Sequence, residues 1–134
     1  MVRIISVIVL FLSLIALAVF EQIYIKKTYD FMKTETKILV QRVMETPDLD
    51  DETVIADDVK MRAERLNNYW QAREHKLCTL IRHVDLSYIS DALIYAKNFI
   101  DFDNKEESMA GLARLTYLLD TYSKMYGFNG ANII

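Results

Sequence analysis

The chain has 134 residues, a formal net charge of −3 and an apolar content of 52%. This length suffices for one small domain with an anchoring segment. The slight acidity, without a strongly basic region or a binding motif, argues against a nucleic-acid partner. Three glycines and one proline leave room for few connections and therefore predict long helices.

The N-terminal segment is apolar and uncharged from Ile4 to Phe20. As a helix it rises about 25 Å, close to the hydrocarbon thickness of a bilayer. We therefore expect residues 1–25 to form a transmembrane anchor in the lipid bilayer. The competing prediction is a cleaved signal peptide and a secreted helical protein, because Ala16-Leu17-Ala18 fits a small-x-small cleavage pattern. The apolar run continues past that site, which favours retention of the anchor.

The positive charges that flank the anchor are nearly balanced. Arg3 lies on one side, and Lys26 and Lys27, offset by Glu21, lie on the other. A short N-terminal flank before a long domain is typical of a signal anchor. We therefore predict a single-pass protein of the cell membrane whose C-terminal domain is extracytoplasmic. The single cysteine, Cys78, is compatible with either side.

The first helix should continue out of the membrane without a break, because no Gly or Pro occurs between Glu21 and Glu45. Tyr24, Phe31 and Ile38 recur at heptad spacing, but Glu35 and Arg42 interrupt the pattern. Packing against later helices of the same chain is favoured over a long isolated coiled coil.

An acidic linker is predicted over about residues 45–52. It contains the only proline, Pro47, and proline disfavours helix at the preceding residue, so the first helix should end near Thr46. The carboxylate spacing lacks the glycine and the final glutamate of an EF-hand loop, so we expect a solvated linker rather than a calcium site.

The second helix is predicted over about 52–83. Its apolar seam comprises Val59, Ala63, Leu66, Trp70, Leu77 and Ile81. Trp70 should anchor the core. A basic flank beside the seam is the candidate partner surface and comprises Arg62, Arg65, Arg73 and Lys76. These cations are suited to an acidic partner or anionic lipid, or their stems merely cover the edge of the seam.

The third helix should begin at an N-cap, Asp85 or Ser87, and end near Phe102. Its predicted buried residues are Leu86, Ile89, Leu93, Ala96 and Ile100. The fourth should span about 105–126, with Gly127 as C-terminal cap. Its predicted buried residues are Met109, Leu112, Leu115, Leu119, Tyr122 and Tyr126. Residues 128–134 should form a short tail.

The short connections force antiparallel packing. The predicted fold is therefore all-α: a transmembrane helix that continues into a small antiparallel helical bundle over residues 26–134. Three helices form the bundle, and the extended anchor helix is a possible fourth member.

Residues capable of chemistry are few and scattered. His75 and Cys78 are helical neighbours, but no further ligand accompanies them, so no metal site is predicted. His83 and Asp85 are interpreted as a structural corner: His83 would end the second helix and complement its dipole, and Asp85 could cap the third. No catalytic triad, carboxylate pair or phosphate loop can be assembled, so neither an enzyme nor a cofactor is predicted.

The chain resembles a family of small single-pass bacterial membrane proteins, domain of unknown function 4363. The features that carry this resemblance are Trp70, Leu80-Ile81-Arg82-His83, Asp85 and Ile89, the leucine-rich helices, and the ending Asn132-Ile133-Ile134. Val84 stands where the family pattern often has an acid after the histidine, which weakens a charged-site role for His83. The resemblance implies a membrane-anchored protein of spore-forming Gram-positive bacteria, with no assigned activity.

Two functions remain open. The first is a non-enzymatic accessory protein that presents its helical bundle to another integral membrane protein. The second is a small membrane-tethered ligand-binding or sensor module, with its site between helices and His83 and Asp85 at the mouth of that site.

Overall fold

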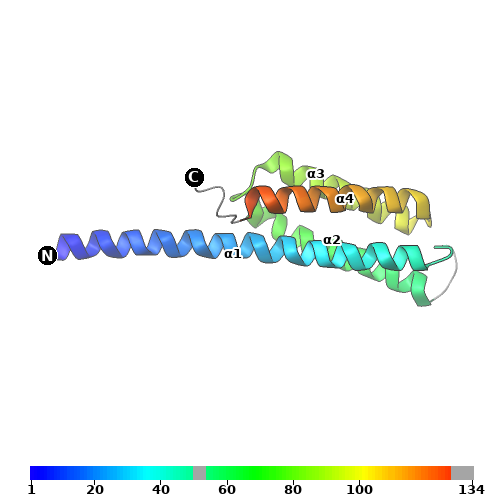
Figure 1. Ribbon diagram of the computed structural model, residues 1–134, viewed down its shortest axis with the longest axis horizontal. Coiled ribbons are helices and arrows are strands. Elements are labelled where there is room, and N and C mark those ends of the chain that lie inside the picture. Colours follow the sequence, from blue (N-terminus) through cyan, green and yellow to red (C-terminus); the bar gives the residue numbers. More distant parts are fainter. Residues whose placement is uncertain (50–53, 128–134) are drawn as a thin grey trace.

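The computed structural model describes residues 1–49 and 54–127 and contains four helices over these ranges (Figure 1). They are α1 (Val2–Glu45), α2 (Val54–Leu77), α3 (His83–Asp101) and α4 (Lys105–Tyr126). Each helix packs against its neighbour in the chain, and α4 also packs against α1, whereas no Cα atoms of the diagonal pairs in the described ranges come within 8 Å. The fold is an antiparallel up-down-up-down bundle. The predicted all-α architecture is confirmed, and the extended first helix is the fourth member of the bundle.

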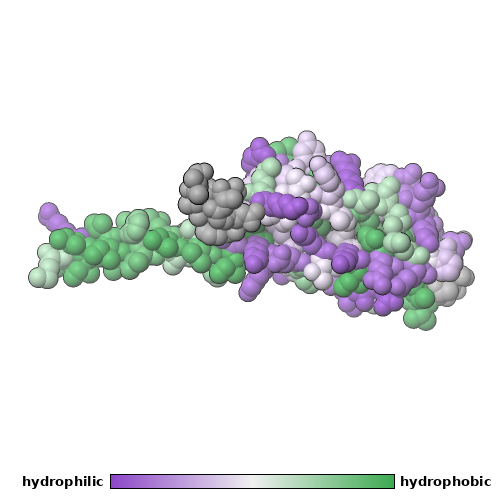
Figure 2. Space-filling model, in the orientation of Figure 1, coloured by the Kyte–Doolittle hydropathy of each residue, from purple (hydrophilic) through white to green (hydrophobic). Residues whose placement is uncertain are grey.

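The N-terminal half of α1 projects from the bundle as an exposed apolar arm, which we define as residues 1–20 (Figure 2). Its most apolar 18-residue window has a mean hydropathy of 2.8 and no buried residue, so the helix is long and apolar enough to span a membrane. The two serines bond to the backbone of their own helix: the Ser6 hydroxyl donates to Val2 O and that of Ser13 to Leu10 O. The two serine hydroxyls are therefore satisfied without water.

The second half of α1 contributes a full stripe to the core. The stripe comprises Ile25, Thr28, Tyr29, Met32, Thr36, Leu39 and Val43. Tyr24, Phe31 and Ile38 are not part of this stripe: Phe31 remains 40% exposed and stacks on Tyr69 at the edge between α1 and α2, with ring centroids 3.8 Å apart. The predicted packing of the first helix against later helices is confirmed. Ile25, Tyr29, Met32, Thr36, Leu39 and Val43 are separated alternately by four and three residues, so the buried stripe keeps heptad spacing on a different face of α1, between α2 and α4.

The end of α1 lies where the proline predicts it. The helix stops at Glu45, and Thr46, in an extended conformation before Pro47, donates its N–H to Arg42 O. Lys105, the first residue of α4, donates to Thr46 O at 2.5 Å and so ties the start of α4 to the end of α1. Of the predicted acidic linker, residues 50–52 lie outside the described residues.

The predicted boundary between the second and third helices is wrong. Helix α2 ends at Leu77, the chain turns, and His83 is the first residue of α3. The turn keeps helix-like hydrogen bonds, such as Ile81 N–H to Leu77 O at 2.8 Å, and Ile81 stays buried. The periodicity of the apolar residues therefore continues through the turn and conceals it. Asp85 and Ser87 lie inside α3, and the N-cap residue is Arg82.

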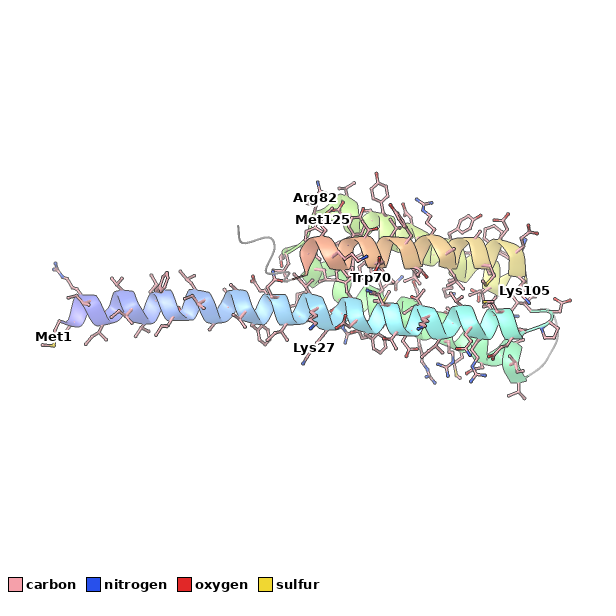
Figure 3. All side chains as sticks on the ribbon, in the orientation of Figure 1. Met1, Lys27, Trp70, Arg82, Lys105 and Met125 are labelled. Carbon is pink, nitrogen blue, oxygen red and sulfur yellow. The ribbon has the colours of Figure 1, made fainter. Side chains whose placement is uncertain are left out.

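The predicted seams of α2 and α3 are confirmed, with Trp70 only 1% exposed at the centre of the bundle (Figure 3). The predicted seam of α4 is confirmed at Leu112, Leu115, Leu119 and Tyr122, whereas Met109 and Tyr126 are only partly buried. Helix α4 has its predicted bounds. The Asn104 side chain caps its start by accepting from Glu107 N–H at 3.0 Å. Gly127 is its C-cap, in an extended rather than left-handed conformation. The predicted tail, 128–134, lies outside the described residues.

Candidate functional site

The polar residues of interest gather at the end of the bundle from which the apolar arm projects. The end of α2, the start of α3 and the end of α4 meet there beside α1, whereas Lys105 marks the opposite end (Figure 3). We call this the arm-side end. The antiparallel order places there the α2–α3 corner that the sequence singles out.

Asp85 is the centre of a hydrogen-bonded cluster at the arm-side end. Asp85 is only 3% exposed, and Arg82 Nε donates to its Oδ2 at 2.9 Å. The Tyr126 hydroxyl donates to the same oxygen, which links α3 to the end of α4. Burial by itself would raise the pKa of Asp85, but the hydrogen bonds from Tyr126 and Arg82 outweigh it and lower that pKa. The carboxylate is therefore ionised and satisfied, which fits a structural role.

Two further tyrosines lie around this carboxylate. Burial raises the pKa of Tyr122 and of Tyr29, and the negative charge of Asp85 raises both further. Tyr29 is 1% exposed, and its hydroxyl has no hydrogen-bond partner among the described residues. Both phenols therefore keep their protons at neutral pH. The sequence alone could not place these tyrosines near Asp85, because their proximity depends on the packing of α1, α3 and α4.

His83 does not have the environment that the sequence predicts. As the first residue of α3 it is exposed, and an imidazolium there would oppose the helix dipole rather than complement it. Its Nδ1 lies 3.5 Å from Cys78 Sγ across the turn. The described residues contain no group of three His, Cys, Asp or Glu side chains positioned to hold a metal ion. The turn thus creates a Cys–His contact that a continuous helix would not make.

The basic flank of α2 does not form one free cationic surface. Arg62 is partly buried, with Nε 2.9 Å from Asp58 Oδ2 and a terminal nitrogen 3.8 Å from Glu35 Oε2 on α1. Arg65 is exposed and contacts the sulfur of Met61 at 3.7 Å. Of these two arginines, Arg62 contributes to α1–α2 packing and Arg65 is accessible to a partner.

The other two cations of the flank lie over aromatic rings. The Arg73 guanidinium is 3.5 Å from the ring centroid of Tyr69 and donates to Tyr69 O at 3.2 Å. Lys76 Nζ lies 4.2 Å from the centroid of Tyr24 and 5.5 Å from that of Phe20. These cation–π contacts orient Arg73 and Lys76 along the seam with α1, and Lys76 remains exposed beside the base of the arm.

A groove of about 560 Å³ opens at the arm-side end between α1 and α4. We call it the arm-side groove. Its α1 wall runs from Ala18 to Asp30, and its α4 wall includes Ser123 and Gly127. Gln22 Oε1 and the Tyr29 hydroxyl, on two residues of this wall, are buried oxygens without a hydrogen-bond partner in the described ranges.

The predicted corner does not line this groove: neither His83 nor Asp85 belongs to its wall. The sequence could not indicate the groove, because it exists where α4 ends against a helix that continues. Locally, the sequence shows only that Gln22 lies two residues after the apolar run.

Comparison of the chain with protein-family models, with curated protein sequences and with solved structures finds no match in any of the three. The family resemblance based on Trp70 and the segment after it therefore stays a prediction.

Proposed function

We propose that this protein is a single-pass membrane protein that acts without catalysis, as an accessory or interaction partner of another integral membrane protein. The observation that carries the proposal is the continuity of α1, whose exposed apolar arm runs without a break into a helix buried in the bundle. Such an arm is a large contiguous apolar surface, which soluble monomers rarely expose. A bilayer would cover it.

The position of the bundle on α1 supports an action close to the membrane surface. Ile25 is the first buried residue of α1, so the bundle begins about 8 Å along the helix from Phe20. A single rigid helix also transmits the orientation of the anchor to the bundle. We propose that the bundle lies on the extracytoplasmic side, beside the extramembrane parts of neighbouring membrane proteins.

The arm-side cluster supports a role without catalysis. Asp85 is engaged by Arg82 and Tyr126, so its charge stabilises the fold rather than facing a substrate. Cys78 and His83 touch on the surface of the turn. A nucleophilic Cys–His pair also needs a third group that orients the imidazole, and no such group bonds to the other ring nitrogen among the described residues.

Membrane attachment is tested by extraction. The full chain should stay with membranes in high salt and in alkaline carbonate. Release into the soluble fraction, or a mature N-terminus at Val19, would show that the arm is a signal peptide.

The topology is tested by cysteine labelling. The substitution Ala113→Cys in a Cys78→Ala background places one thiol on the exposed side of α4. Labelling of intact cells is expected, and labelling only after lysis would reverse the orientation.

The docking surface is tested with the two exposed cations of the basic flank. The double variant Arg65→Glu/Lys76→Glu reverses charge without breaking the pairs that Arg62 makes with α1. We expect it to abolish crosslinking to a partner membrane protein while helix content is retained. Arg114→Glu, exposed on α4, is the matched control and should leave crosslinking intact. Equal crosslinking of both variants would exclude this surface.

The arm-side groove supports the second function, a membrane-tethered ligand-binding or sensor module. Its volume of about 560 Å³ falls in the range of small-molecule sites, about 300–1,000 Å³. The site of such a module would lie between α1 and α4, not at His83 and Asp85. A ligand that binds only the folded protein should raise the melting temperature in a screen of the detergent-solubilised chain, and a screen without any such shift would count against this function.

A further inference from the structure

We infer that the arm-side groove binds one bilayer phospholipid whose head group is zwitterionic and donates hydrogen bonds, of the phosphoethanolamine type. This inference deepens the ligand-binding function and rests on the proposed membrane anchoring. It follows from the place of the groove along α1 and from the chemistry of its wall.

The wall of the groove changes from apolar to polar along α1 away from the arm, as a membrane does from its acyl chains to its head groups. Ala18 and Val19 belong to the apolar arm, whereas Lys26 and Asp30 on the same wall lie about two to three turns further along the helix. When the arm spans the bilayer, one end of the groove therefore lies at the level of acyl chains and the other at the level of head groups. An amphiphile with the same polarity fits this gradient.

The charged part of the wall favours a head group with both signs of charge. Lys26 and Asp30 stand four residues apart and so lie on neighbouring turns of one helix face. A phosphate is the natural partner of the lysine ammonium, and a lipid ammonium is the natural partner of the carboxylate. An anionic lipid would satisfy Lys26 but would be repelled by Asp30.

The polar part of the wall favours a head group that donates at one end and accepts at the other. A primary ammonium supplies N–H donors for the Asp30 carboxylate, whereas a trimethylammonium supplies none. The Tyr29 hydroxyl has no hydrogen-bond partner among the described residues. Burial raises the pKa of Tyr29, so its hydroxyl keeps a proton to donate to a phosphate or ester oxygen.

The experiment uses the full chain in nanodiscs of phosphatidylcholine that contain equal small fractions of phosphatidylethanolamine and phosphatidylglycerol. Native mass spectrometry then identifies the lipid that stays bound when the nanodisc is removed. We expect one phosphatidylethanolamine per chain, retained about tenfold over either competitor. Failure of the chain to insert would overturn the membrane anchoring itself. Insertion without a retained lipid would overturn only the lipid site.

Two pairs of variants locate the site. Ala18→Leu narrows the apolar end of the groove, and Ala16→Leu adds the same bulk at a position that does not line it. Tyr29→Phe removes the unpartnered hydroxyl, and Tyr117→Phe removes one at a position that is 69% exposed. Ala18→Leu and Tyr29→Phe should lose the retained lipid, and their controls should keep it. Because the Tyr29 hydroxyl has no protein partner in the described ranges, melting in lipid-free detergent should not fall.

Three results would overturn the assignment. The first is retention of phosphatidylglycerol or phosphatidylcholine as readily as phosphatidylethanolamine. The second is unchanged retention in the Ala18→Leu and Tyr29→Phe variants. The third is a preference that arises only in a chain shortened to end at Gly127, which would identify residues 128–134 as the occupant of the groove.

Discussion

Replacement of Trp70 tests whether the α2 seam holds the bundle together. Trp70 is 1% exposed, and its Nε1 donates to Ser90 Oγ at 2.7 Å. The Ser90 hydroxyl lies 2.8 Å from Glu74 Oε1, so the indole belongs to a short polar chain that joins α2 to α3. The substitution Trp70→Ala therefore removes the largest core side chain and one interhelical hydrogen bond.

The expected cost of Trp70→Ala is about 3–5 kcal/mol, the range for a buried tryptophan cut to alanine. That is a large share of the roughly 5–15 kcal/mol that stabilises a typical domain. Trp70→Phe keeps most of the apolar area and loses the Nε1 bond, which contributes about 1 kcal/mol, so it should cost clearly less than Trp70→Ala. This difference separates the contribution of packing from that of the hydrogen bond.

The assay is urea unfolding of the full chain in detergent micelles, followed by far-UV circular dichroism because the variants lack the only tryptophan. The arm should stay helical in the micelle, so the change in signal reports on the bundle. Tyr117→Ala, at a position 69% exposed, is the control and should shift stability by no more than about 0.5 kcal/mol. An unchanged midpoint for Trp70→Ala would refute the reasoning and would mean that the seam faces a partner.

Three further predictions follow from single contacts. Because its hydrogen bonds lower the pKa of Asp85, its ionised form stabilises the fold at pH above the ordinary carboxylate value, and this contribution is lost as the pH falls through the lowered value. Melting temperature should therefore fall below about pH 4, and Asp85→Asn should weaken that dependence; identical pH profiles would contradict it. Gly111→Ala would place a Cβ 2.9 Å from Ala96 Cα on α3 and should cost about 1–3 kcal/mol in urea unfolding, whereas no loss would show that α3 and α4 can separate freely. Asn104→Ala removes the side chain that accepts from Glu107 N–H and should cost about 1 kcal/mol, whereas Asn104→Asp should retain the cap.

Much of the fold could be predicted because it depends on local properties. The apolar arm is a matter of composition, and the seams of α2, α3 and α4 follow from the 3.6-residue period of residues such as Leu66, Leu93 and Leu115. The end of α1 before Pro47 follows from a steric restriction between adjacent residues. Such signals need no knowledge of what lies across the core.

The errors and omissions concern places where distant segments meet. The turn before His83 keeps helical hydrogen bonds and buries Ile81, so its periodicity matches that of a continuous helix. The buried face of α1 is set by two partner helices, which is why Tyr29 is buried and Phe31 lies at an edge.

The sequence by itself therefore determined an apolar N-terminal helix, four amphipathic segments and their order. Only the tertiary structure decided the candidate site, because Asp85 near the start of α3, Tyr126 at the end of α4 and Tyr29 in the middle of α1 come together only when the bundle closes. The arm-side groove has the same origin. Helix α4 ends against the side of α1, while α1 continues as the arm, so the groove depends on the different lengths of α1 and α4 and on how they align. No single segment encodes such a juxtaposition, since it arises from packing between residues far apart in the chain.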